Sequence, residues 1–326
     1  MANEKSAVLD RILTLELARV TEAAAVAAAR LRGQGDEKAA DQVAVDAMRT
    51  ELNRLPIDGT VVIGEGERDE APMLFIGEEV GTKEGPKVDI ALDPLEGTTI
   101  CAKNQPNSLA VIALAEGGSL LYAPDVYMEK IAIGPGYPEG LINIDKSPAE
   151  NLKALAAAKG CEVNQLTACV LDRARHSKII EDIRSVGAAV LLIGDGDVAG
   201  VIHTTDPDET GVDIYIGTGG APEGVLAAAA LRCIGGQMQG RLVLDTPEKI
   251  SRAKTMGVED PNKVYDMNEM AKGDVLFAAS GVTDGNMLDG VKFGKGEIHT
   301  HTVVMRSATG TVREIKARHQ DTEKFS

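Results

Sequence analysis

The sequence has 326 residues, a net charge of −16 and an apolar fraction of 44%, with only 3% aromatic residues and no tryptophan. This length exceeds the usual size of a single hydrophobic core, so we expect two domains or one large layered unit. The negative charge argues against binding to nucleic acid or to an anionic membrane surface, but local cations would still allow a small anionic substrate.

No apolar run approaches the ~18 residues of a membrane span, so no membrane association is expected. The first residues lack the charged and then apolar layout of a signal peptide. The four cysteines are far apart and form no CxxC pair, which favours free thiols over a disulfide or a zinc site. They are Cys101, Cys161, Cys169 and Cys233. We therefore expect a cytoplasmic protein.

Two amphipathic helices are expected first, at residues 13–31 and about 39–55, because apolar residues recur there at spacings of three and four. Short apolar runs then predict strands, with helices between several of them at 176–186 and 222–234. The predicted strands are 60–63, 88–92, 109–114, 168–171, 188–193, 212–216, 242–244 and 275–279. This alternation predicts layered sheets covered by helices, an α/β fold.

The end of the chain, at about 297–317, is predicted to form two strands joined by the turn at 308–310. The stretch 134–151 is rich in Gly, Pro and Asp and is the best candidate for a domain junction. We therefore expect an N-terminal metal-binding αβ domain at 1–150 and a C-terminal substrate-binding αβ domain at 151–326.

Acidic residues follow or open several of these elements. Asp41 lies near the start of the second helix, where by itself it would only favour the positive helix N-terminus. Glu65 follows the 60–63 strand and is flanked by Gly64 and Gly66, which favours an unusual turn or a close backbone approach over a generic polar loop.

Residues 93–98 read Asp-Pro-Leu-Glu-Gly-Thr and come directly after an apolar strand. Pro94 cannot continue a central strand, so it is expected to turn the chain and bring Asp93 and Glu96 within reach of one point. Gly97 and Thr98 can present backbone N–H groups and a hydroxyl to phosphate oxygens.

Glu223 follows a glycine-rich strand end and stands beside Pro222 at the start of a helix. Considered alone, it is as well explained as an acidic first turn. Taken together, the four segments offer five carboxylates that could converge on one place: Asp41, Glu65, Asp93, Glu96 and Glu223. Unpaired, such carboxylates repel each other, and divalent cations relieve that repulsion. Oxygen ligands without His or Cys suit Mg²⁺ or Mn²⁺ better than zinc.

The motif at 93–98 resembles the signature of the metal-dependent, lithium-sensitive phosphatase superfamily. Longer stretches at 59–74, 123–130 and 219–224 resemble class II fructose-1,6-bisphosphatases of bacterial type, and the resemblance covers essentially the whole chain. It implies a layered αβαβα sandwich (sugar phosphatase fold) with two sub-domains.

The resemblance also implies roles for individual residues. The metal ligands would be Asp41, Glu65, Asp93, the Leu95 backbone carbonyl, Glu96 and Glu223. Thr98 would orient and help to deprotonate the attacking water, assisted by Glu65 or Asp69. The substrate would be contacted by Glu96, Gly97, Thr98, Tyr127, Arg173, Arg175, Asp195, Asp197 and Gly220. Many relatives place a lysine directly after the Gly-Asp of the first acidic cluster, whereas here Glu37 intervenes before Lys38, so its reach to the phosphate stays open.

The leading hypothesis is metal-dependent hydrolysis of the 1-phosphate of fructose 1,6-bisphosphate to fructose 6-phosphate, in gluconeogenesis or Calvin-type carbon metabolism. One alternative is sedoheptulose-1,7-bisphosphatase activity, alone or alongside. Others are a non-catalytic sugar-phosphate-binding regulatory protein, which predicts loss of the metal ligands or of Thr98, and a divalent-cation buffer, which has no need of Arg173 and Arg175. Relatives form dimers or tetramers, so a homodimer or homotetramer is expected.

Overall fold

The computed structural model describes residues 9, 11–66 and 73–325. The chain forms two compact units: unit 1 is Met1–Leu120 with Lys272–Ser326, and unit 2 is Leu121–Ala271. This division differs from the predicted junction at 150/151 for a physical reason. The last strands of the chain pair with strands of unit 1, and the strand that begins at Tyr127 pairs with strands of unit 2.

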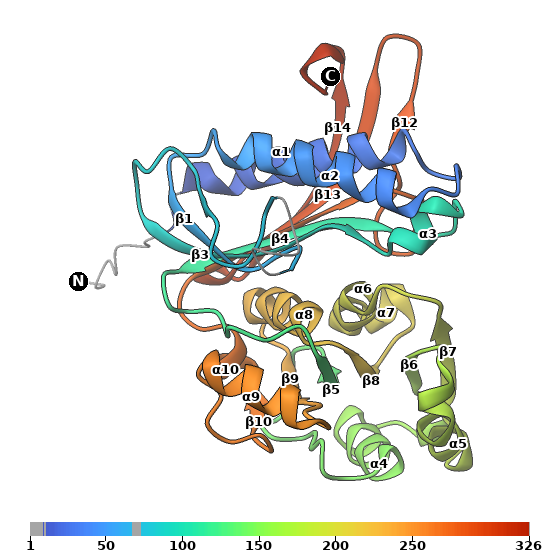
Figure 1. Cartoon of the computed structure of the whole chain (residues 1–326). Coiled ribbons are helices and arrows are strands. Elements are labelled where there is room, and N and C mark those ends of the chain that lie inside the picture. The colour runs from blue at the N-terminus through green and yellow to red at the C-terminus, as the bar shows by residue number, and fades with distance from the viewer. Residues whose placement is uncertain (1–8, 10, 67–72, 326) are drawn as a thin grey trace, which may run out of the picture. The chain divides into compact units, whose positions relative to one another are not determined.

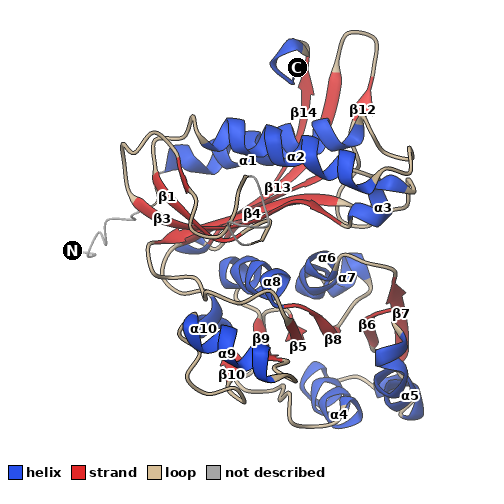
Figure 2. Ribbon diagram, in the orientation of Figure 1, coloured by secondary structure: helices blue, strands red, loops and turns tan. Residues whose placement is uncertain are grey.

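Unit 1 pairs two long helices with one sheet (Figures 1 and 2). Its helices are α1 (Arg11–Ala29), α2 (Glu37–Leu52) and the short α3 (Thr98–Ala102). Its strands are β1 (Asp58–Ile63), β2 (Glu79–Val80), β3 (Lys87–Glu96), β4 (Leu109–Glu116), β11 (Val275–Gly281), β12 (Lys292–Phe293), β13 (Ile298–Arg306) and β14 (Thr311–His319). Short 3-10 helices lie at Ser307–Thr309 and Glu323–Phe325.

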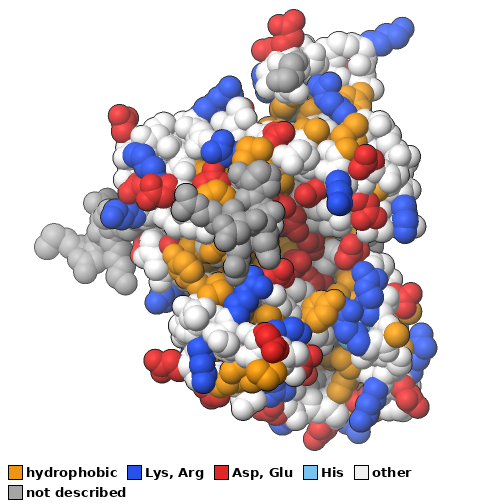
Figure 3. Space-filling model, in the orientation of Figure 1, with side chains coloured by type: hydrophobic (Ala, Val, Ile, Leu, Met, Phe, Trp, Pro, Cys, Tyr) orange, Lys and Arg blue, Asp and Glu red, His pale blue; other side chains and the backbone are white. Residues whose placement is uncertain are grey.

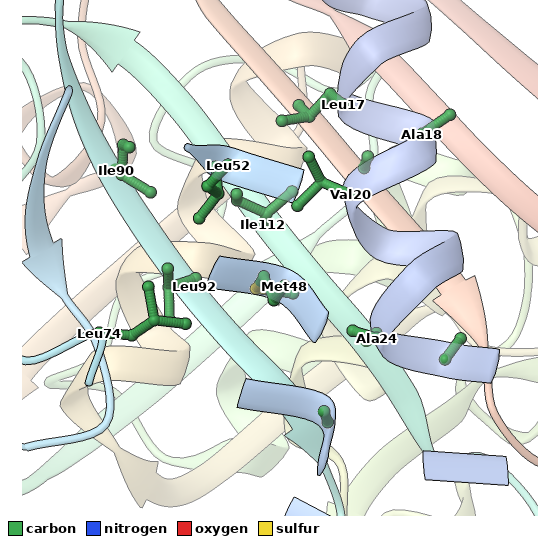
Figure 4. Close-up of a cluster of buried hydrophobic side chains, with 14 of the residues drawn as sticks. Leu17, Ala18, Val20, Ala24, Met48, Leu52, Leu74, Ile90, Leu92 and Ile112 are labelled. Atoms are coloured by element: carbon green, nitrogen blue, oxygen red, sulfur yellow. The ribbon is translucent and has the colours of Figure 1, made fainter. Parts of the chain in front are cut away.

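The sheet of unit 1 has the strand order β12-β13-β11-β4-β3-β1-β2, and β14 pairs with β13 over its full length. Helices α1 and α2 cover one face of it (Figure 1). The core between these layers consists of buried aliphatic side chains such as Leu17 and Val20 of α1, Met48 and Leu52 of α2, and Ile112 of β4 (Figure 4). Apolar residues on a helical period therefore face apolar strands, as the sequence predicts.

Unit 2 is an α/β sandwich of its own. Its strands are β5 (Tyr127–Ile133), β6 (Thr167–Leu171), β7 (Ala189–Ile193), β8 (Ile214–Gly220), β9 (Gln237–Leu242) and β10 (Val264–Asp266). Its helices are α4 (Pro148–Lys159), α5 (Ser177–Ser185), α6 (Asp197–Ile202), α7 (Pro207–Thr210), α8 (Ala221–Ile234), α9 (Pro247–Thr255) and α10 (Met267–Met270). Short 3-10 helices lie at Val163–Gln165, Ala174–His176 and His203–Thr205.

The sheet of unit 2 has the order β10-β9-β5-β8-β6-β7, with helices on both of its faces (Figure 2). The helix α8, which carries ten buried residues, packs on strands β5, β8 and β9. Helices α4 and α5 pack together, and α4 begins at a capping box in which Ser147 and Glu150 bond reciprocally. The α/β class and the two layered sub-domains are thus confirmed, as αβ in unit 1 and αβα in unit 2.

Most predicted elements are present, with small shifts at their ends. The two N-terminal helices are α1 and α2, and the predicted C-terminal hairpin is β13 and β14, joined at Gly310, whose φ of 55° places it in the left-handed region. The strand predicted at 242–244 is wrong in position, because β9 ends at Leu242. All four cysteines are free thiols, as expected. Among the helices of the described residues, none is long and apolar enough to cross a membrane.

Candidate active site

In unit 1, Asp41, Glu65 and Asp93 come from three different elements. Asp41 lies in the second turn of α2, a helix that begins with Asp36 accepting a hydrogen bond from the Ala39 N–H at 3.0 Å. Glu65 follows β1, and its N–H donates to the Leu74 carbonyl at 3.0 Å. Asp93 lies on β3, which pairs in parallel with β1. Neighbouring strand ends and a helix start therefore bring the three acids to one part of unit 1.

The pKa values of these carboxyl groups reflect both their burial and their closeness to one another. Burial, and then the charge of Asp93, raise the pKa of Asp41 to about 6. Burial, followed by the charges of Asp93 and Asp41, raises the pKa of Glu65 to about 9. Burial and like charge thus act in the same direction on both groups, because each disfavours the ionised form. Keeping three carboxylates ionised so close together, and partly buried, therefore costs free energy.

The motif at 93–98 shapes the end of β3. Its pairing with β4 shifts register between Asp93 and Glu96, so β3 bulges rather than turning at Pro94. The Leu95 N–H donates to Asp93 Oδ1 at 3.0 Å, and carboxylate oxygens of Asp93 and Glu96 lie within 4.8 Å of each other. The expected turn at Pro94 is therefore wrong: the proline lies inside the strand, and the bulge brings both acids to one point. A bulge often aims side chains at a functional site in this way.

The chain turns three residues later. Gly97 has a φ of 78°, in the left-handed region that favours glycine, and Thr98 is the first residue of α3. Glu96 is buried, and its backbone carbonyl accepts a hydrogen bond from the Ser108 hydroxyl at 3.0 Å. The Leu95 side chain is buried and has no donor atom, so only the backbone carbonyl of Leu95 could serve as a ligand. Asp69, the other predicted base, lies outside the described residues.

The donor set of unit 1 fits a hard divalent cation. It consists of carboxylate oxygens from Asp41, Glu65, Asp93 and Glu96, the ligand type that Mg²⁺ and Mn²⁺ prefer. The pKa values of Asp41 and Glu65 agree with this, since they are raised by burial and then by like charge, and a nearby cation would offset both. We conclude that this cluster could hold a metal ion.

In unit 2, the predicted substrate-binding residues gather around the ends of β5, β6, β7 and β8. Tyr127 begins β5, and the guanidinium of Arg175 lies 4.7 Å from the centre of its ring. Arg175 Nε and Nη2 both donate to the Thr218 carbonyl, at 3.0 and 2.7 Å. Arg173 donates to the Gly194 carbonyl at 2.5 Å, and its Nη2 lies 3.5 Å from Asp195 Oδ1. The structure thus brings both arginines to strand ends and fixes their planes.

Asp197 is in a different environment from Asp195. It is buried, and its Oδ2 lies 2.6 Å from Lys130 Nζ and 3.3 Å from the Tyr215 hydroxyl. Lys130 is itself buried and donates to the Gly220 carbonyl at 2.7 Å. A methyl group on Gly219 would clash with the Asp197 carboxylate, so the strand end fits this pair only as glycine. The predicted sugar contact of Asp197 stays a prediction, while its observed bonds hold the end of β8.

Sequence reasoning missed three supporting residues here: Lys130, Tyr215 and His176. The His176 ring donates from Nδ1 to the Leu171 carbonyl at 2.8 Å and accepts the Thr218 N–H at Nε2, at 2.9 Å, while burial lowers its pKa. Lys130 could have been noticed in the sequence, because it lies between Met128 and Ala132 on the same face of β5. Both of these neighbours are apolar and buried. A lysine in that position needs an anionic partner.

Glu223 lies in the first turn of α8, directly after the glycine-rich end of β8. Unit 2 therefore contains the predicted order of elements: a strand, a glycine-rich strand end, a proline and a helix. A side chain on Gly220 would meet the Glu223 carboxylate, which explains the glycine at that position. Its role as a fifth metal ligand stays a prediction.

Comparison with known proteins assigns the chain that carries these two sets of residues to a family. Residues 11–319 match the family described as bacterial fructose-1,6-bisphosphatase, glpX-encoded. The chain belongs to this family.

Its relatives agree with that assignment. A protein of a Synechococcus strain named D-fructose 1,6-bisphosphatase class 2/sedoheptulose 1,7-bisphosphatase is 46% identical, over 95% of this chain and 96% of its own. A protein of Prochlorococcus marinus with the same name is 45% identical, over 95% of this chain and 97% of its own. Among solved structures, an inositol monophosphatase from Anabaena matches 59% of this chain and 71% of its own at 14% identity, with a TM-score of 0.31. The family match and the two relatives at 45–46% identity confirm the resemblance to the class II family that the sequence motifs indicate.

Proposed function

We propose that this bisphosphatase-family chain hydrolyses the 1-phosphate of fructose 1,6-bisphosphate to give fructose 6-phosphate, with Mg²⁺ or Mn²⁺ as cofactor. The observation that carries the proposal is the cluster of Asp41, Glu65 and Asp93, in which burial and then the charge of neighbouring carboxylates raise the pKa of Asp41 and of Glu65. Such a cluster is costly for folding and useful for a phosphatase, because it prepares a place for a cation and a phosphate.

The metal ligands in this proposal are Asp41, Glu65, Asp93, Glu96, the Leu95 carbonyl and Glu223. When bound, divalent cations neutralise phosphate oxygens and lower the pKa of water. The side chains of the chain itself position the reactants, which supplies most of the rate enhancement in phosphoryl transfer.

In the chemical step, a water oxygen forms a bond to phosphorus while the bond between phosphorus and the sugar oxygen breaks. Thr98 accepts a hydrogen bond from the water or donates one to it and so aims it, and Glu65 or Asp69 takes the water proton. The leaving sugar oxygen takes up a proton from solvent. No protein nucleophile is required.

The second phosphate and the sugar are assigned to unit 2. Arg173 and Arg175 present guanidinium N–H groups in planes fixed by backbone carbonyls, which suits bidentate binding of phosphate. Tyr127 is about half exposed and close to Arg175, as a substrate-contacting residue must be. Asp195, Asp197 and Gly220 complete the proposed set around the sugar.

A second candidate is sedoheptulose-1,7-bisphosphatase activity, alone or alongside, because the names of the relatives include it. Steady-state kinetics on both sugar bisphosphates with Mg²⁺ or Mn²⁺ will distinguish an enzyme specific for one sugar bisphosphate from a bifunctional enzyme. A much larger kcat/KM for fructose 1,6-bisphosphate supports the single-substrate reading, and equal values show a bifunctional enzyme.

The test of catalysis itself is phosphate release with and without a chelator, in the wild type and in Thr98→Ala. We expect release to stop with the chelator and to fall to background in the variant, while the circular dichroism spectrum is unchanged. A non-catalytic sugar-phosphate-binding protein would release no phosphate under any of these conditions. We also propose a homodimer or homotetramer in the cytoplasm.

A further inference from the structure

The ladder of hydrogen bonds between β6 and β8 of unit 2 ends before β8 does. Strand β6 ends at Leu171, and within the described residues its parallel pairing with β8 reaches only as far as Cys169 and Tyr215. Strand β8 continues to Gly220. The N–H and C=O of a strand residue point to the same side, so the last residues of β8 need other partners on the side of β6.

Two neighbouring side chains of the loop after β6 supply those partners at Thr218. His176 accepts the Thr218 N–H at Nε2, at 2.9 Å, and Arg175 donates from Nε and Nη2 to the Thr218 carbonyl, at 3.0 and 2.7 Å. His176 is only 1% exposed and packs against Gly217, where a methyl group would lie 3.5 Å from the ring carbon Cε1. Side chains thus replace the bonds that a longer β6 would have made.

The other ring nitrogen of His176 ties the same loop to the end of β6. Nδ1 donates to the Leu171 carbonyl at 2.8 Å, and this carbonyl also accepts the Arg173 N–H at 2.9 Å. Because Nε2 accepts the Thr218 N–H, the ring is neutral and carries its proton on Nδ1. Burial lowers the pKa of His176, which favours this neutral form. One imidazole therefore joins the ends of two strands.

Arg175 is exposed, so its long side chain has many rotamers available unless contacts select one of them. The Thr218 carbonyl takes two of its five N–H groups, and the centre of the Tyr127 ring lies 4.7 Å from its guanidinium carbon. Three N–H groups remain for an anion. Holding the guanidinium in one plane before a ligand arrives lowers the entropy cost of binding.

We propose that His176 is a positioning residue for phosphate binding: it fixes Thr218, and through the Thr218 carbonyl it fixes the guanidinium of Arg175. This role rests on the function proposed above, in which Arg175 binds the second phosphate of the sugar bisphosphate. The buried ring itself does not touch the substrate. Loss of its bond to Thr218 should therefore weaken binding of the second phosphate and leave the chemical step at the 1-phosphate nearly unchanged.

Two substitutions divide the bonds of the ring between them. In His176→Gln the side-chain oxygen can reach the position of Nε2 and accept the Thr218 N–H, whereas in His176→Asn the shorter amide can donate only to the Leu171 carbonyl. In Mg²⁺, we expect His176→Asn to raise KM for fructose 1,6-bisphosphate about tenfold, or ~1.4 kcal/mol, with kcat within twofold. By titration calorimetry, Kd for fructose 6-phosphate should rise by the same factor. His176→Gln should raise both constants less than threefold.

His203→Gln is the matched control for loss of a buried histidine. His203 belongs to the same unit and is 2% exposed, and neither of its ring nitrogens has a hydrogen-bond partner among the described residues. We expect KM and Kd of this variant to stay within twofold of the wild-type values, even where its Tm falls. A thermal melting curve of each variant distinguishes lost stability from lost affinity.

A double-variant cycle tests whether His176 acts through Arg175. Adding His176→Asn to Arg175→Gln should leave Kd for fructose 6-phosphate within twofold of that of Arg175→Gln alone, because the guanidinium that His176 positions is already gone. The positioning role is overturned if the two single effects multiply, or if the Asn and Gln variants of His176 bind equally weakly.

The wild type distinguishes this failure from that of the proposed function. A wild-type protein that neither binds fructose 6-phosphate nor releases phosphate from fructose 1,6-bisphosphate overturns the function, and the positioning role with it. An active wild type whose KM and Kd are unchanged by His176→Asn, or are changed as much by His203→Gln, overturns the positioning role alone.

Discussion

Unit 1 and unit 2 treat buried charge in opposite ways. In unit 1, Asp41, Glu65 and Asp93 are of one sign, and their proximity raises pKa values to about 6 and about 9. In unit 2, Asp197 is more deeply buried than these three acids, and it lies 2.6 Å from the buried ammonium of Lys130. The first arrangement needs a cation from solution and the second contains its own. The comparison shows which charges stabilise the fold and which prepare a site.

Both units have mixed charge on the surface seen in Figure 3, where Lys and Arg side chains lie among Asp and Glu. The net charge of −16 is therefore no guide to any one region. Local composition at strand ends, rather than total charge, decides what each surface can bind.

The largest effect is expected from the acidic cluster. Asp41→Asn removes a proposed metal ligand, and we expect kcat/KM to fall about a thousandfold, or ~4 kcal/mol of transition-state stabilisation. Asp46→Asn, the same change on the exposed side of the same helix, is the matched control and should leave kcat/KM within twofold. Equal activity of the two variants would contradict the assignment of Asp41.

The charge pair of unit 2 should respond in stability. Lys130→Met leaves the Asp197 carboxylate buried without its ammonium, so we expect the free energy of unfolding to fall by about 3–5 kcal/mol in urea titrations. Adding Asp197→Asn removes the orphaned charge and should restore much of that loss. If the double variant is less stable than Lys130→Met, charge compensation is not the role of the pair.

Metal should stabilise the protein, and more so at high pH. Because the pKa values of Asp41 and Glu65 are raised, the metal-free protein loses stability as pH rises through about 6 and then about 9. A cation removes that loss, and at a hundred times its Kd it adds about 2.7 kcal/mol. The increase in Tm on adding Mg²⁺ or Mn²⁺ should therefore be larger at pH 8 than at pH 5. A metal-induced Tm increase independent of pH would show that the cation binds away from these carboxylates.

The smallest effect is expected at Glu22, a carboxyl group of unit 1 whose pKa is raised by burial and not by a neighbouring carboxylate. Burial raises the pKa of Glu22, which accepts a hydrogen bond from the Thr300 hydroxyl at 2.8 Å. Its contribution to stability is present below the ordinary glutamate pKa and is lost as pH rises through the raised one. Glu22→Gln keeps an acceptor oxygen and should gain stability relative to the wild type as pH rises from 4 to 7, by denaturant unfolding at each pH. A constant difference across that range would show that Glu22 does not titrate there.

Much of the fold could be predicted because its signals are local. The helical period of α1 and α2 and the apolar run of β4 are each readable within a short window. Strand β9 was misplaced because Gln237, Gln239 and Arg241 alternate with its buried positions and interrupt any apolar run. The unit boundaries could not be found locally, since they depend on β11 pairing with β4 across more than a hundred residues.

The site could be predicted only in part, and for a related reason. Glu65, Asp93 and Glu96 stand out because acids that follow an apolar strand are conspicuous in a sequence, whereas Asp41 alone is only an acid near the start of a helix. The bulge that aims Asp93 and Glu96 is not conspicuous, because it depends on how β3 pairs with β4. The bonds of Lys130 with Asp197 and Gly220 also join distant segments, and no spacing rule connects them.

The double crossing of the chain between the units has a consequence for synthesis. Unit 2 is one continuous stretch, and its ends are joined where the Leu121 N–H donates to the Met270 carbonyl at 2.9 Å. It can therefore complete its fold as soon as it leaves the ribosome. Unit 1 cannot, because one edge of β4, a strand buried at seven of its eight positions, must wait for β11 to be translated. During that interval unit 1, which carries most of the proposed acidic ligands, is the more vulnerable unit, and it is the one that a chaperone would have to shield.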